Sequence, residues 1–119
     1  MKRLFIFLLC LAFGCGKSLP KFEGIDLKQW KEDRLGCSGF REKSIDLFSS
    51  QKDKLKGLSE DDILKLLGRP DRNELYKRNQ KFYHYYVEPS AKCDSTKQNA
   101  RQLSIRFNAV DLAKEVVIE

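Results

Sequence analysis

The sequence has a single histidine, His84, and only four cysteines among its 119 residues. Protein zinc sites are built from several Cys and His side chains, and with one histidine and cysteines that are better suited to a disulfide the chain lacks the ligands for such a site. The sequence also has no Cys-x-x-Cys pair, no glycine-rich phosphate loop and no Gly-x-Ser-x-Gly nucleophile motif. We therefore expect no catalytic residue, no metal site and no cofactor, and we expect the chain not to be an enzyme.

A strong excess of one charge is also absent. The chain carries 23 Lys and Arg residues against 17 Asp and Glu residues, which gives a formal net charge of +6. The two signs are mixed along the sequence, as on a solvated surface, and no motif of a known nucleic-acid reader is present. We therefore expect no nucleic-acid partner.

Long hydrophobic runs are confined to the N-terminus, where residues 4–13 are apolar and follow two basic residues. This pattern is typical of a secretory signal, and the run is too short for a lasting membrane span. The sequence LAFGC at residues 11–15 resembles the bacterial lipobox, in which the cysteine becomes the lipidated first residue of the mature chain. The resemblance implies a lipoprotein signal peptide over 1–14 and lipidation of Cys15. An ordinary cleaved signal with a stray cysteine is the alternative.

The remaining cysteines, Cys37 and Cys93, form an even pair in an exported chain. Oxidising compartments favour disulfides, so the default prediction is a Cys37–Cys93 bond. A redox-active pair is the functional alternative. Beyond the signal, we expect a lipidated tether over residues 15–24 and a single domain over residues 25–119.

Helical patterns fill the first half of this domain. Residues 59–67 have the clearest signals, because Ser59 is a good N-cap, acidic residues follow it, and Gly68 and Pro70 can end the helix. Two further helices are expected at 27–35 and 41–55.

After Pro70 the apolar period changes from helical to alternating, which predicts strands at 73–77, 81–88, 102–108 and 113–118. Helices followed by strands indicate an α+β fold. We expect a two-layer sandwich, with the N-terminal helices packed on one face of a three- to four-stranded antiparallel sheet.

The second expected strand is unusually aromatic. Its alternating pattern places one set of side chains on the core and the other outside, and exposed tyrosines are effective binding contacts. Ordinary cross-strand packing is the alternative explanation. We expect the outward or rim positions to be Phe82, His84 and Tyr86, and the candidate partner-binding residues are Phe82, Tyr83, His84, Tyr85 and Tyr86.

Residues 57–119 resemble the SmpA/OmlA-type lipoproteins, which include the small lipoprotein of the outer-membrane β-barrel assembly machine. The shared phrase is Gly57-Leu58-Ser59-x-x-x-Ile63-x-x-x-Leu67-Gly68-x-Pro70-Asp71, a capped helix followed by strands. Other proteins with this two-layer fold bind and inhibit secreted enzymes. The earlier stretch Trp30-x-x-Asp33-x-x-x-Cys37 instead resembles small uncharacterised lipoproteins of Bacteroidetes-type bacteria.

These resemblances imply a non-catalytic lipoprotein of the bacterial cell envelope, anchored through its lipid to the outer membrane and facing the periplasm. Its expected role is that of a protein–protein interaction module in envelope structure or outer-membrane assembly. We expect a monomer that binds an envelope protein partner. An inhibitor-type binder of a secreted enzyme and a small unrecognised enzyme are the alternatives.

Overall fold

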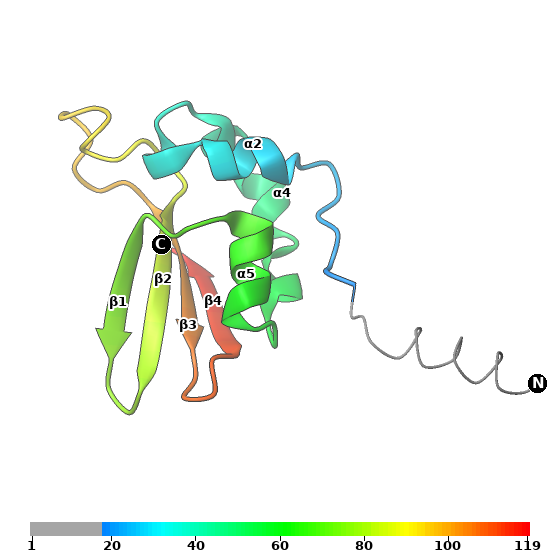
Figure 1. Ribbon diagram of the computed structural model, residues 1–119. Helices are drawn as coiled ribbons and strands as arrows, with labels where there is room; N and C mark the ends of the chain where they lie inside the picture. The colour runs from blue at the N-terminus through cyan, green and yellow to red at the C-terminus, as the bar shows by residue number, and fades with distance from the viewer. Residues whose placement is uncertain (1–17) are drawn as a thin grey trace, which may run out of the picture.

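The structure is a computed structural model that describes residues 18–119 (Figure 1). The predicted signal peptide, Cys15 and the first part of the predicted tether lie outside these residues. Across 18–119, no helix combines the length and the apolar character needed to cross a membrane.

The chain forms a run of short helices and then a four-stranded sheet. The sheet is antiparallel with the strand order β1-β2-β3-β4. The α+β two-layer prediction is therefore confirmed. The elements are α2 (Leu27–Glu32), η1 (Arg34–Gly36), α3 (Phe40–Lys43), α4 (Ile45–Ser49), η2 (Lys52–Leu55), α5 (Glu60–Leu67), β1 (Arg72–Tyr76), β2 (Gln80–Tyr86), β3 (Gln102–Phe107) and β4 (Ala113–Ile118).

The helix predicted over 41–55 is broken into three short pieces. Ser44 lies at the first break, where its hydroxyl donates a hydrogen bond to the Phe40 carbonyl at 2.9 Å. Such a local bond competes with regular helix geometry. The helix predicted over 27–35 stops at Glu32, because Asp33 leaves the helical conformation with a ψ of 60°. Leu35 then adopts a φ of 61° as the chain turns toward the disulfide.

Helix α5 forms as the sequence predicts. The Ser59 hydroxyl accepts a hydrogen bond from the Asp62 backbone N–H at 3.2 Å, which satisfies one of the free donors at the helix start. The side chains of Ile63, Leu66 and Leu67 are buried against the sheet.

The core lies between the helices and one face of the sheet. Trp30 is its centre: the ring is fully buried and stacks on Phe48 at 5.3 Å and against Tyr85 at 5.4 Å. Phe22 is also buried and stacks on Phe48 at 5.0 Å. Phe22, which lies within the predicted tether over 15–24, is thus part of the core.

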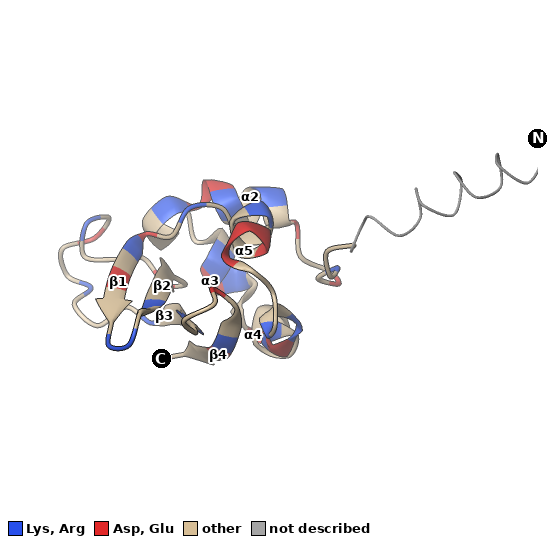
Figure 2. Cartoon of the chain, turned by 60° about the horizontal axis from the view of Figure 1, so that its bottom comes forward, with Lys and Arg blue, Asp and Glu red and all other residues tan. Residues whose placement is uncertain are grey.

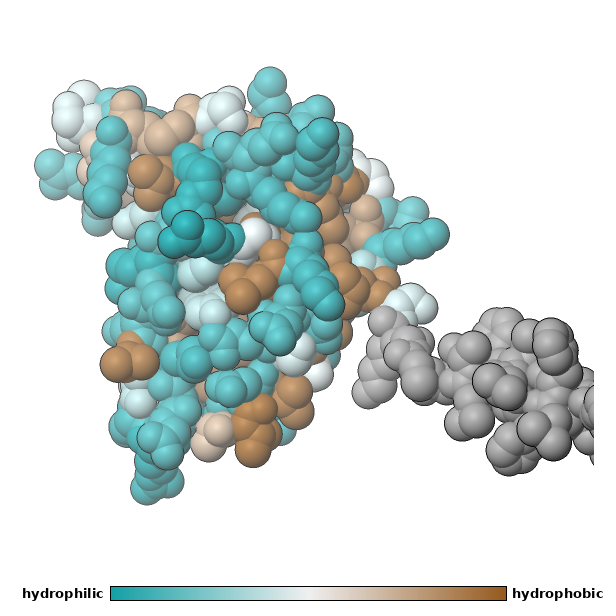
Figure 3. Space-filling view, viewed as in Figure 1, coloured by the Kyte–Doolittle hydropathy of each residue, from teal (hydrophilic) through white to brown (hydrophobic). Residues whose placement is uncertain are grey.

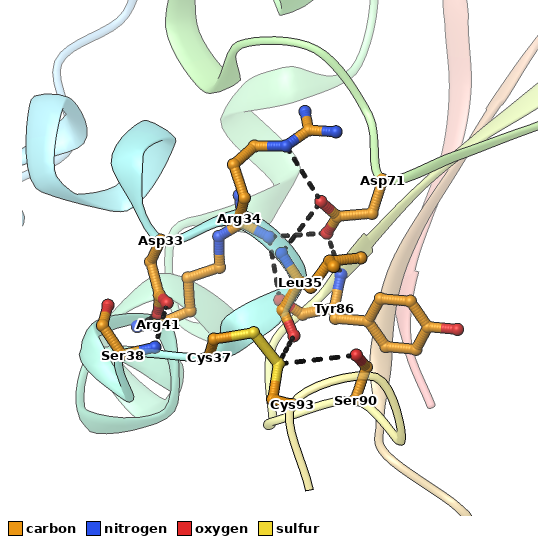
Figure 4. Close-up of a disulfide and its surroundings, with 10 residues drawn as sticks. All are labelled: Asp33, Arg34, Leu35, Cys37, Ser38, Arg41, Asp71, Tyr86, Ser90 and Cys93. Atoms are coloured by element: carbon orange, nitrogen blue, oxygen red, sulfur yellow. Dashed lines mark hydrogen bonds and ion pairs between the residues drawn. A yellow bond between two sulfur atoms is a disulfide. The ribbon is translucent and has the colours of Figure 1, made fainter.

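A buried ion pair joins the helices to the sheet. Arg41 in α3 and Asp71, which precedes β1, are 2.8 Å apart, and both side chains are fully buried. Asp71 also accepts hydrogen bonds from the backbone N–H groups of Leu35 and Tyr86, at 3.0 and 2.8 Å (Figure 4). One carboxylate thus connects η1, α3 and β2.

The guanidinium of Arg41 has further partners on the helical side. Its Nε donates to the Trp30 carbonyl at 2.9 Å, and its plane lies 4.2 Å from the centre of the Trp30 ring. Asp33 accepts hydrogen bonds from the backbone N–H groups of Arg41 and Ser38. Burial raises the pKa of Asp33, but these hydrogen bonds outweigh it, and the pKa lies below its usual value.

The Cys37–Cys93 disulfide is present beside this ion pair, which confirms the predicted pairing (Figure 4). It fastens the loop after β2 to the helical layer. Gly36 makes the close approach feasible, because a Cβ at this position would lie only 2.5 Å from the Glu88 carbonyl oxygen and its φ is +71°.

Replacing Asp71 with Asn should destabilise the protein by about 3–5 kcal/mol, because Arg41 would keep a buried charge without its counter-ion. Urea unfolding of the two proteins measures this difference. The matched control is Asp53→Asn, at an exposed acid whose ion pairs lie on the surface, for which the change should be about 0–1 kcal/mol. Equal losses in the two variants would contradict the central role of Asp71.

The disulfide closes a loop with a sequence separation of 56 residues. The chain-entropy treatment gives such a loop about 4 kcal/mol of stability. The double variant Cys37→Ser/Cys93→Ser should lose about this amount in denaturant unfolding. The reduced wild-type protein is its control and should unfold at the same concentration; a variant as stable as the oxidised protein would contradict the prediction.

Candidate functional site

The sheet has one covered face and one open face. Along β2, Tyr83 and Tyr85 point into the core and are 4% and 0% exposed. Phe82, His84 and Tyr86 occupy the opposite face, as predicted, and Phe82 and Tyr86 are partly exposed. The structure therefore removes Tyr83 and Tyr85 from the candidate contact residues, because the helices already cover them.

Both buried tyrosines use their hydroxyls within the fold. Tyr85 donates to the Gly68 carbonyl at 2.8 Å, which holds the end of α5 on the sheet. Tyr83 donates to Glu60, whose other oxygen is 3.0 Å from Lys81. Burial raises the pKa of Glu60, yet these two partners outweigh it and hold the pKa below its usual value. Burial and the Glu60 carboxylate both raise the pKa of Tyr83.

On the open face, His84 lies in a row of hydrogen bonds across three strands. Its Nε2 is 2.8 Å from Glu74 of β1, and its Nδ1 is 2.7 Å from the Ser104 hydroxyl of β3. His84 and Ser104 are direct partners in the strand register. Both residues are only 7% exposed, so His84 faces outward but is covered by its neighbours.

An acid, an imidazole and a hydroxyl in this order also make up the triads of serine hydrolases. Such an enzyme needs free N–H donors beside the serine to stabilise an oxyanion. Ser104 lies in a strand that is paired on both sides, opposite His84 and Val117, so the surrounding backbone donors belong to the sheet. We interpret these hydrogen bonds as structural contacts that fix the orientation of the imidazole and connect three strands.

An aromatic row runs along the same face toward the β1–β2 turn. The rings of Phe82 and His84 are stacked, with their centroids 5.5 Å apart. The rings of Tyr76 and Phe82 pack edge to face, with their centroids 5.2 Å apart. Arg72 and Arg106 flank this row. The open face therefore combines aromatic surface with charges of both signs, a composition that suits a protein partner.

The two edges of the sheet differ. Beside β4, the Gly57 N–H donates to the Ala113 carbonyl and the Ala113 N–H to the Leu58 carbonyl, each at 2.8 Å. Lys52 Nζ donates to the Val116 carbonyl at 3.0 Å, which covers the strand further along. The β4 edge is therefore protected.

Within residues 18–119, no backbone segment forms hydrogen bonds along the outer edge of β1. All five residues of β1 are exposed, and Figure 1 shows the strand at the outer margin, away from the helices. An edge strand presents backbone N–H and C=O groups without partners, and it can accept an added strand. Leu75 is 85% exposed, and Figure 3 shows a small hydrophobic patch over β1 on a hydrophilic surround.

The turn at 77–79 extends this edge and is basic (Figure 2). Arg78 and Asn79 have φ values of 58° and 61°, the left-handed conformation that a tight hairpin turn uses. Lys77 Nζ lies 5.5 Å from the centre of the Tyr76 ring.

Sequence reasoning found the aromatic strand but missed the exposed edge, Glu74 and Ser104. The edge could have been inferred, because the first strand of a simple meander has a neighbour on one side only. The row through His84 carried no local signal, since His84 and its two partners come from three different strands.

Within residues 18–119, no group of three or more His, Cys, Asp or Glu side chains is placed to hold a metal ion. Comparison with known proteins found no matching family model, curated protein or solved structure. The likeness to SmpA/OmlA-type lipoproteins thus stays a prediction from the sequence.

Proposed function

We propose that this protein is a lipid-anchored module of the bacterial cell envelope that binds an envelope protein through the open side of its sheet. The observation that carries the proposal is the contrast between the two sheet edges. One edge is closed by backbone hydrogen bonds, whereas β1 is exposed along its whole length and continuous with the aromatic face.

The proposed location has separate support. The N-terminal sequence has the pattern of a lipoprotein signal ending at Cys15. The Cys37–Cys93 disulfide fits an oxidising compartment such as the periplasm. In this proposal, a lipid on Cys15 confines the domain to the outer membrane, on its periplasmic side.

The mode of binding follows from the two exposed features. A strand of the partner adds to β1 through backbone hydrogen bonds, and its side chains meet Leu75 on one face and the row from Tyr76 to Phe82 on the other. The Arg41–Asp71 pair and the disulfide hold the sheet rigid on its far side, so little conformational entropy is lost on binding.

Photoreactive residues test the binding surface in cells. A photoreactive phenylalanine analogue at Phe82 or at Leu75 should give one dominant protein adduct, identified by mass spectrometry, because both positions lie on the proposed surface. The matched control is Leu47, an exposed apolar position on the helical layer, at 44% exposure. The proposal fails when positions 82 and 75 give no adduct or only those seen at 47.

Substitution of Cys15 tests the anchor. A Cys15→Ser variant cannot carry a thioether-linked lipid, so it should leave the membrane pellet after cell fractionation, whereas the wild-type protein should remain there. Cys37→Ser is the control for loss of a cysteine as such and should still pellet. Continued pelleting of the Cys15→Ser variant would contradict lipidation at this residue.

A further inference from the structure

A hollow of about 320 Å³ opens at the end of the sheet opposite the two tight turns. It lies between the open face and the long loop that follows β2, which Figure 1 shows at that end of the molecule. Its lining consists of Tyr86, Ala91, Gln98, Asn99, Ala100, Gln102 and Glu119. The volume is at the lower end of the range for small-molecule sites, which is about 300–1,000 Å³.

The strand register builds the floor of this hollow. Tyr86 and Gln102 are direct partners across β2 and β3, and they form the next pair on the same face after His84 and Ser104. The backbone of Gln102 is in turn bonded to that of Glu119 in both directions, at 2.8 and 3.0 Å. The floor is therefore held by three adjacent segments of a rigid sheet.

The polar groups of the lining have spare hydrogen-bonding capacity. Gln102 Oε1 accepts a weak hydrogen bond from Arg72 at 3.3 Å, which leaves both protons of its amide nitrogen available. Among the described residues, the side chains of Gln98, Asn99 and Glu119 and the Tyr86 hydroxyl form no hydrogen bond with the protein. These groups belong to residues that line one hollow, and a small number of polar groups with free hydrogen-bonding capacity is a feature of ligand sites.

The lining also defines the class of ligand. Carboxamides both donate and accept hydrogen bonds, so they match hydroxyl groups, which do the same. None of the lining residues is Lys or Arg, and Glu119 is acidic, so the lining itself offers an anionic ligand no positive group. The lining also includes the aromatic side chain of Tyr86, which can pack on an apolar C–H surface, and two small residues, Ala91 and Ala100.

We propose that this hollow binds a neutral pyranose sugar, with Tyr86 beneath the ring and the carboxamides of Gln98, Asn99 and Gln102 on its hydroxyls. The site goes beyond the proposed protein-binding surface, since it uses residues at the other end of the sheet from Leu75 and the β1–β2 turn. Its failure would leave the crosslinking result at positions 75 and 82 unaffected.

Nuclear magnetic resonance of the full chain, in a detergent without a sugar head group, tests the proposal. N-acetylglucosamine is the neutral probe and glucuronate the anionic one. N-acetylglucosamine should shift the side-chain NH₂ signals of Gln98, Asn99 and Gln102 in a saturable manner, and glucuronate should bind more weakly. Absence of shifts at the solubility limit of N-acetylglucosamine, or tighter binding of glucuronate, would overturn the proposal.

Two tyrosine variants make the test specific. Tyr86→Ala removes the ring beneath the sugar and should weaken binding up to about tenfold, the effect of losing one aromatic contact of roughly 1.4 kcal/mol. Tyr76→Ala removes the same side chain from the same face but outside the hollow, and it should bind as the wild-type protein does. Unchanged binding in a folded Tyr86→Ala protein, or equal loss in both variants, would also overturn the proposal.

Discussion

The ion pair between Arg41 and Asp71 is the interaction on which the two layers depend. It lies where η1, α3, the start of β1 and the end of β2 meet, and both side chains are fully buried. A buried pair is not stabilising simply because opposite charges attract, since desolvation of both ions opposes the attraction. Here the additional hydrogen bonds from the backbone of Leu35 and Tyr86, and the Trp30 ring beneath the guanidinium, compensate part of that loss. Burial still lowers the pKa of Arg41, and its Nη2 has no hydrogen-bond partner within residues 18–119. The result is a fixed geometry between helices too short to be stable alone.

This ion pair lies on one side of the sheet, and the two faces of the sheet differ as a result. The helices, the disulfide and the ion pair occupy the covered face, where Tyr83 and Tyr85 are buried. The opposite face is stabilised mainly by side-chain contacts between strands, of which the row through His84 spans three. A face built in this way can be open to solvent without loss of order, and so it can meet a ligand or partner with little rearrangement.

The sequence indicates the layers well but not the parts that join them. Local signals are sufficient for α5, because its cap, apolar stripe and terminating Gly68 all lie within one short segment. The alternation in β2 likewise predicts which side chains face outward. The break at Ser44 and the inclusion of Phe22 in the core depend on tertiary contacts, as do the partners of Asp71. Residues far apart in the chain create these features, so no periodicity reveals them. The hollow is of the same kind, because its walls come from three separate segments.

The exposed β1 edge raises the question of how the protein avoids pairing with any available strand. Natural sheets prevent unwanted strand pairing at such edges with charged residues, proline and short strands. β1 carries two such charges, Arg72 and Glu74, and Pro70 lies shortly before its start. A strand that adds to it must therefore satisfy a positive and a negative charge on one face and the exposed Leu75 on the other. The same features that prevent random association thus impose a specific requirement on a partner, because an added strand has to accommodate the ion pair that Arg72 and Glu74 form with each other at 3.8 Å.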